Sequence, residues 1–100
     1  MMVELDASFN EYPLDTINLT VDEPDLDLGA ASALAKTTAR EMDSNAMMLS
    51  YHSGKTGEFW PKYECGGNGR PPWIVFAEAR GYNLKIDINA GDYEFFYVRF

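Results

Sequence analysis

The sequence predicts an α+β domain in which an antiparallel sheet of five or six strands packs against one helix. The main observation is a C-terminal stretch, residues 73–100, that is rich in β-branched and aromatic residues and interrupted by glycine-containing turns. A run of helix formers over residues 26–43 and several shorter apolar runs complete the pattern. We expect an irregular lead-in at residues 1–15 and a single domain at residues 16–100.

The charge balance of the chain excludes several classes of partner. The 100 residues carry a net charge of -8, and only eight of them are Lys or Arg. Nucleic acids and anionic membrane surfaces both need clustered positive charge, so neither is an expected partner. The single Cys65 excludes an intramolecular disulfide, and the N-terminus lacks the charge pattern of a secretory signal. These features predict a cytoplasmic protein.

The N-terminal half predicts one strand followed by one helix. Residues 16–22 alternate apolar and polar side chains, which is typical of a half-buried strand. Residues 26–43 then favour a helix, for which either Asp25 or Asp27 is available as N-cap. The helix is rich in alanine, so we expect it to approach the sheet closely, with Lys36, Arg40 and Glu41 toward solvent.

Two further strands and a loop are expected in the middle of the chain. Residues 46–53 fit a second strand and residues 58–64 a shorter third strand, joined by a turn at residues 54–57. Three glycines and two prolines in residues 65–72 predict a loop, because they support neither helix nor ladder. The single helix would cover one face of the sheet.

The C-terminal stretch predicts a three-strand meander over residues 73–80, 83–89 and 93–100. Gly81-Tyr82 suits a two-residue hairpin loop, because glycine supplies the positive φ that such a turn requires. Residues 89–92 fit a four-residue loop, which fixes the register of the last two strands. On the inner face this register pairs Ile88 with Tyr93, Ile86 with Phe95 and Leu84 with Tyr97.

The opposite, outer face of this meander is unusually apolar for a surface that meets water. The same register places Asp87 opposite Glu94 there, and like charges across a ladder are unfavourable. We therefore expect the outer face to bind a second copy of the chain. Its apolar side chains are the candidate interface residues: Ile74, Phe76, Phe96, Val98 and Phe100.

Three patterns were weighed as sites of chemistry. Residues 53–56 resemble the end of a phosphate-binding loop, but the earlier glycine is missing and no helix is expected to follow, so a hairpin turn is favoured. His52 and Cys65 are the only residues of their types, too few for a structural zinc site and without an evident orienting group for catalysis. Asp87 and Glu94 are weak candidates for a hard cation or an acid–base pair.

A group of aromatic side chains near the glycine-rich loop is the candidate ligand site. Aromatic residues beside a loop can stack a planar ligand, or they can simply close the end of the core. Packing is the favoured interpretation, because fourteen aromatics in a domain of this size usually serve the core. The candidate ligand-binding residues are Phe59, Trp60, Tyr63 and Trp73.

The C-terminal half resembles a family of short, uncharacterised prokaryotic proteins. The resemblance is carried by Trp73, Ala77-Glu78, Arg80-Gly81, Asn83-Leu84, Asp87-Ile88-Asn89 and Gly91. In that family an N-terminal strand and helix precede a sheet-forming C-terminal half. The resemblance implies no catalytic residue and no cofactor, because the family has no assigned activity.

These observations predict a small non-enzymatic protein that forms a homodimer, through the outer face or through the strand that ends at Phe100. The first alternative is a small-molecule-binding module that uses the aromatic group beside residues 65–72. The second is a small metal-dependent enzyme. No catalytic residue and no cofactor are assigned.

Overall fold

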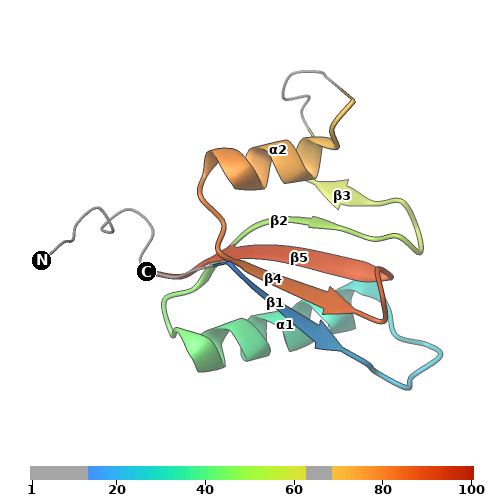
Figure 1. Ribbon diagram of the computed structural model, residues 1–100. Helices are drawn as coiled ribbons and strands as arrows, with labels where there is room; N and C mark the ends of the chain where they lie inside the picture. Colours follow the sequence, from blue (N-terminus) through green and yellow to red (C-terminus); the bar gives the residue numbers. More distant parts are fainter. Residues whose placement is uncertain (1–13, 63–68) are drawn as a thin grey trace, which may run out of the picture.

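The computed structural model describes residues 14–62 and 69–100 and shows a sheet with a helix on each face (Figure 1). The strand order is β1-β4-β5-β2-β3. The α+β class is confirmed, but the sheet is mixed, because β1 runs parallel to β4 and the other neighbours are antiparallel. The elements are β1 (Asp15–Leu19), α1 (Leu28–Met42), β2 (Met47–His52), β3 (Phe59–Trp60), α2 (Pro72–Ala79), β4 (Leu84–Ile88) and β5 (Tyr93–Val98).

Helix α1 forms where the sequence predicts it. The side chain of Asp27 accepts a hydrogen bond of 2.8 Å from the backbone N–H of Ala30, so Asp27 is the N-cap. Ala31, Ala35 and Ala39 form a fully buried stripe that faces the sheet. Their small side chains let α1 lie close to β4 and β5, as the alanine content indicated.

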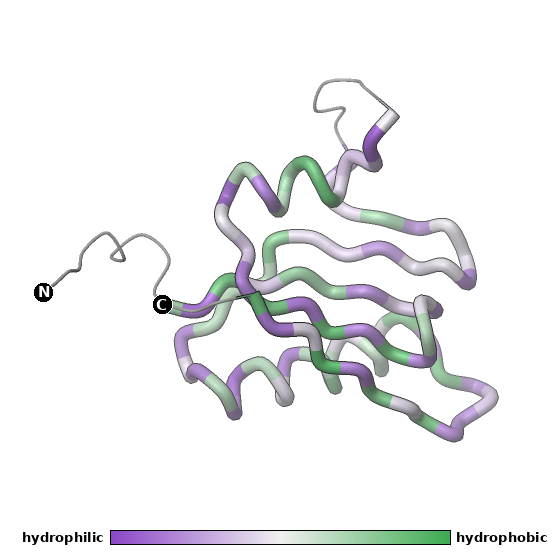
Figure 2. Tube along the Cα trace, viewed as in Figure 1, coloured by the Kyte–Doolittle hydropathy of each residue, from purple (hydrophilic) through white to green (hydrophobic). Residues whose placement is uncertain are grey.

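The hairpin of β4 and β5 also confirms the prediction. A four-residue loop joins the two strands, and Ile88 pairs with Tyr93, as expected. The side chains on the α1 face of this hairpin are almost completely buried. Figure 2 shows the alternation of hydrophobic and hydrophilic residues along β4, which directs its apolar set toward α1. The remaining predicted pairs, Ile86 with Phe95 and Leu84 with Tyr97, are present as well.

Residues 73–80 are helical, so the predicted first strand of the meander is wrong and the sheet faces two helices. Pro72 occupies the first turn of α2, where its missing N–H costs nothing. At the other end Gly81 has a φ of 77° and donates to the carbonyl of Glu78, while Tyr82 donates to the carbonyl of Ala77. This pair of bonds is a Schellman motif, which ends a helix. Gly81-Tyr82 is therefore a helix terminus and not a hairpin loop.

Helix α2 changes the environment of the outer face. It packs on β2, and Phe76 of the helix and Phe96 of β5 are 8% and 2% exposed. The expectation that both lie on an open apolar surface is wrong, because the predicted first strand of the meander, residues 73–80, folds over that surface as helix α2. Strand β5 also lies between β4 and β2, so the strand that ends near Phe100 is not an edge. The edges are β1 and β3.

Two asparagines hold the ends of β4 to the neighbouring strands. The Asn89 side chain accepts from the N–H of Val21 and donates to its carbonyl, beyond the end of β1. The buried Asn83 side chain makes the same pair of bonds with the backbone of Arg99, beyond β5. These side-chain bonds replace ladder bonds where the strands stop, so they fix the parallel register of β1 and the path of the C-terminus.

The turn between β2 and β3 is the hairpin turn favoured for residues 53–56. The hydroxyl of Ser53 accepts from the N–H groups of Lys55 and Thr56 and donates to the carbonyl of Asp92. Strand β3 covers only Phe59–Trp60, and the end of the predicted strand, residues 63–64, lies outside the described residues. No phosphate-binding loop geometry is present in this turn, because no helix follows it.

Candidate functional site

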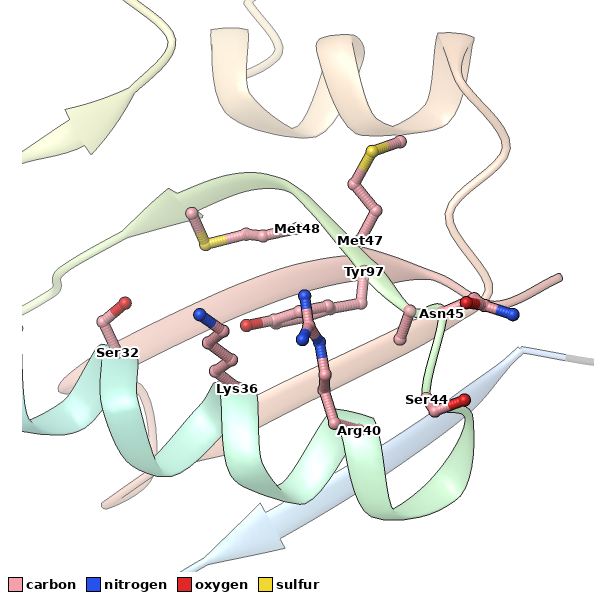
Figure 3. Close-up of a pocket in the computed structure, with 9 residues that line it drawn as sticks. Ser32, Lys36, Arg40, Ser44, Asn45, Met47, Met48 and Tyr97 are labelled. Atoms are coloured by element: carbon pink, nitrogen blue, oxygen red, sulfur yellow. The ribbon is translucent and has the colours of Figure 1, made fainter.

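A cleft lies between α1 and the start of β2 and has a volume of about 650 Å³ (Figure 3). The helix supplies one wall, the turn after the helix closes one end, and β2 with the underlying β5 forms the other side. This volume falls within the range of about 300–1,000 Å³ that is typical of small-molecule sites. The lining residues are Ser32, Lys36, Arg40, Ser44, Asn45, Ala46, Met47, Met48 and Tyr97.

Two cationic side chains rise from α1 into the cleft. Lys36 and Arg40 are one helical turn apart, so they lie on the same side of the helix. Within residues 14–62 and 69–100, neither takes part in an ion pair. None of the described residues that line the cleft is acidic, although Glu41 lies beside Lys36 and Arg40 in an adjoining hollow and the whole chain carries a net charge of -8. The cleft is therefore a local positive region on an acidic protein.

Tyr97 of β5 reaches the cleft from the sheet. The residue is 3% exposed, and in Figure 3 its hydroxyl lies between the side chains of Lys36 and Arg40. The described part of the chain offers that hydroxyl no hydrogen-bond partner. Burial raises the pKa of Tyr97 above its usual value of 10.0, and the positive charge of Arg40 acts in the opposite direction. The hydroxyl is thus neutral at physiological pH and available as a donor.

The acidic residue nearest to the closed end of the cleft is already engaged. Asp43 accepts hydrogen bonds from the backbone N–H groups of Asn45 and Phe100, at 2.9 and 2.6 Å. These two bonds lower the pKa of the Asp43 carboxyl. Because the carboxylate holds the turn and the C-terminus in place, it does not neutralise Lys36 or Arg40.

The outer face carries a polar cluster at the predicted pair of carboxylates. Asp87 does lie opposite Glu94, as expected, but the two carboxylates are directed to different partners. Glu94 contacts His52 at 3.2 Å and Lys85 at 3.3 Å, while Asp87 accepts from the N–H of Gly91 at 2.7 Å. Contacts of Glu94 with Lys85 and the His52 ring, and of Asp87 with a turn amide, therefore relieve the like-charge contact. Among the described residues, no group of three or more His, Cys, Asp or Glu is placed to hold a metal.

The predicted aromatic site is a packed cluster. Trp73 of α2 stacks on His52 with ring centroids 4.0 Å apart and also contacts Phe59 at 5.0 Å. Trp60 is 45% exposed and meets Phe76 edge-on at 6.4 Å. The indole N–H of Trp73 is buried without a hydrogen-bond partner. This arrangement fits the packing interpretation, in which the aromatic rings fasten α2 to β2 and β3.

The remaining candidate residues either lie outside the cleft and the aromatic cluster or fall outside the described residues. Ile74 and Val98 are half-buried, and Phe100 is 63% exposed beside the end of α1. Tyr63 and Cys65 lie outside the described residues, so the pairing of Cys65 with His52 stays untested.

The sequence placed Lys36 and Arg40 toward solvent and Tyr97 on the inner face, and both predictions are confirmed, but it did not show that these three residues lie side by side. The spacing of two cations by four residues on one helix of an acidic chain was the available signal. Nothing in the pattern placed Tyr97 between them, since that contact joins residues far apart in the sequence.

The fold and the cleft define a small α+β domain with a basic site on an acidic chain. A family model described as a domain of unknown function (DUF5619) matches residues 14–97, and the chain belongs to that family. It is similar to an uncharacterised protein from Archaeoglobus fulgidus, at 34% identity over 84 residues, which cover 84% of this chain and 86% of the relative. These findings confirm the resemblance to an uncharacterised prokaryotic family.

A solved structure supports the fold. The crystal structure of a protein from Archaeoglobus fulgidus is similar to this chain, with a TM-score of 0.74 and 33% identity. The match covers 87% of this chain and 95% of that one. None of the helices in residues 14–62 and 69–100 is long and apolar enough to cross a membrane.

Proposed function

We propose that this protein is a binding module for a small anionic molecule, which occupies the cleft between α1 and β2. The observation that supports the proposal most strongly is the pair of cations, Lys36 and Arg40, which make no ion pair within residues 14–62 and 69–100 and share a cleft whose described lining residues include no acid. This site differs from the aromatic group that the sequence offered as a ligand site, because the rings of that group pack against one another. The protein would act without chemistry of its own, as the absence of an assigned catalytic residue implies.

The energetic argument concerns the two cations. Like charges one turn apart on a helix destabilise it by about 0.2–0.5 kcal/mol. Among the described residues, Asp43 is engaged by backbone N–H groups, and Glu41, which lies beside both cations, makes no ion pair with either of them. An anion bound between Lys36 and Arg40 would remove the repulsion and gain charge-assisted hydrogen bonds.

The experiment is a thermal-unfolding screen of the purified protein with named anions and matched neutral compounds. Inorganic phosphate, succinate and ribose 5-phosphate are the anions, and ribose is the neutral compound. A ligand that binds only the folded state raises the unfolding temperature as its concentration increases. We expect a rise with at least one anion and none with ribose.

The control variant removes the same charge elsewhere. Lys36→Gln with Arg40→Gln should abolish the rise, whereas Lys55→Gln with Lys62→Gln changes the net charge equally and should leave it intact. Lys55 and Lys62 are exposed and do not line the cleft. If both double variants respond like the wild type, or if no anion has an effect, the proposed function is wrong.

Self-association is a second candidate function, at a different surface from the one expected. The outer face is covered by α2, but Met42, Met47 and Phe100 are 43%, 52% and 63% exposed. The bond between the Phe100 N–H and Asp43 places Phe100 beside the end of α1, next to Met42. We propose that the chain forms a homodimer through this corner. The cytoplasmic location stays a prediction.

Analytical ultracentrifugation tests the dimer independently of the ligand. Phe100→Glu with Met42→Glu should reduce the mass in solution from dimer to monomer. Leu14→Glu is the control, because Leu14 is also a large exposed apolar residue, at 55%. A wild-type protein that sediments as a monomer across the accessible concentration range would remove this second candidate.

A further inference from the structure

The donor groups of the cleft approach it from more than one direction. Arg40 presents a planar fork of N–H donors, and Lys36 presents a compact ammonium group. The hydroxyl of Tyr97 comes from the sheet, whereas the hydroxyl of Ser44 is directed away from these groups (Figure 3). A planar carboxylate presents two oxygens in one plane, whereas a tetrahedral phosphate presents oxygens in several directions. The arrangement favours the tetrahedral group.

The charge of the cleft points to the same class of anion. Lys36 and Arg40 supply two positive charges, and no acidic residue among the lining groups reduces them. A phosphomonoester carries a charge of about −1.5 to −2 at neutral pH and has three strong acceptor oxygens. A single carboxylate would leave one of the two cations without compensation. Arginine is also the residue that matches phosphate geometry with two parallel hydrogen bonds.

Tyr97 adds a neutral donor to this cationic pair. Its ring belongs to the buried core, and its hydroxyl has no partner in the described part of the chain. Tyr97 as a whole residue is 3% exposed, but its hydroxyl reaches the cleft and is open there to a ligand or to water. Because burial keeps the phenol protonated, the hydroxyl donates to an anion and adds no repelling charge.

The size of the cleft indicates that the phosphate is carried on an organic body. A volume of about 650 Å³ far exceeds what an inorganic phosphate ion fills. Beyond the cations, the walls offer polar groups on Ser32 and Asn45 and apolar contacts on Met48. This mixture suits a small polar body, such as a sugar, whose hydroxyl groups bind at the rim.

We infer that the ligand of the cleft is a phosphomonoester of a small polar metabolite, held by Lys36, Arg40 and the hydroxyl of Tyr97. The inference rests on the proposed anion-binding function and names the class of the anion. In this inference Tyr97 and the two cations have different roles. The cations attract any anion, whereas the tyrosine hydroxyl favours a phosphate group over a carboxylate, because phosphate has more acceptor oxygens.

Isothermal titration calorimetry with ribose 5-phosphate, inorganic phosphate and succinate tests the inference on the full-length wild-type protein. We expect ribose 5-phosphate to bind at least about tenfold more tightly than the other two. Tyr97→Phe keeps the buried ring and removes only the hydroxyl. It should weaken ribose 5-phosphate binding about tenfold, since a hydrogen bond to a charged group is lost, and change succinate binding less.

The variant Tyr93→Phe is the matched control, because it also removes a phenol hydroxyl from β5. That hydroxyl donates to the carbonyl of Leu26, and Tyr93 does not line the cleft. Binding should therefore be unchanged in this variant. Absence of binding by all three anions would overturn the proposed function itself. If succinate binds as tightly as ribose 5-phosphate, or if Tyr97→Phe keeps full affinity, only the inference of a phosphate ligand is wrong. If inorganic phosphate binds as tightly as ribose 5-phosphate, the inference that the phosphate is carried on an organic molecule is wrong.

Discussion

The sheet face under α1 and the sheet face under α2 are built in different ways. Under α1, the side chains of β4 and β5 belong to one core cluster, and Ile86 and Phe95 have no exposed surface. Under α2, the buried Phe96 lies among ionic groups, with Lys85 over its ring at 5.7 Å. Ion pairs through Glu94 and the stacking of His52 on Trp73 complete this second face.

The comparison teaches that an apolar strand face need not be an interface. The apolar residues on the sheet face that is turned away from α1 indicated that something covers this face, and that inference is confirmed. The cover comes from the chain itself, because α2 folds back onto β2. The first face is held mainly by burial of apolar area, and the second by aromatic contacts and partly exposed charges.

The largest effect on stability is expected from a substitution in the core under α1. Phe95→Ala should lower the free energy of unfolding by about 3–5 kcal/mol, because a large buried ring is lost from the core. Phe96→Ala, its neighbour on the other face, should cost about 1–2 kcal/mol less, since flexible groups such as Lys85 can move into the space. Urea denaturation measures both, with Leu14→Ala expected within about 0.5 kcal/mol of wild type. A Phe96 variant as unstable as the Phe95 variant would contradict the comparison.

A smaller effect tests how α2 ends. Gly81→Ala should cost about 1–2 kcal/mol, because Gly81 has a φ of 77° and a side chain is strained there even though a Cβ would meet nothing within 4 Å. The matched change, Gly29→Ala in α1, should stabilise the protein by about 0.5 kcal/mol, since alanine favours the helix. Thermal unfolding of both variants gives the signs. Equal signs would show that α2 does not end in the Schellman motif.

The smallest effect is expected for the stacked rings on the sheet face under α2. A double-mutant cycle of His52→Ala and Trp73→Leu should give a coupling free energy of about 0.5–1.5 kcal/mol, the contribution expected for stacked rings. The control cycle combines His52→Ala with Leu34→Ala. Its coupling free energy should be less than about 0.5 kcal/mol, because Leu34 lies in α1 on the other face of the sheet. If the two couplings are equal, the stack does not hold α2 to β2.

Local patterns predicted much of the fold but misread one segment. The alanine stripe of α1 and the register of β4 with β5 were correct, because both depend on neighbours in sequence and on one buried face. Residues 73–80 were misread because a short apolar run has no clear period, and its β-branched residues favoured a strand. Pro72 at the start and Gly81 at the end were the signals for a helix.

The sequence by itself determined the α+β class, helix α1, the β4–β5 hairpin, the facing carboxylates Asp87 and Glu94, and the resemblance to a family without assigned activity. Only the tertiary structure decided the strand order, the parallel pairing of β1 and the cover on the second face. It also decided the cleft, where Tyr97 of the last strand lies between two cations of the first helix. The physical reason is that hydrophobic periodicity specifies which side of an element is buried, while the partner buried against it is chosen by contacts between distant segments.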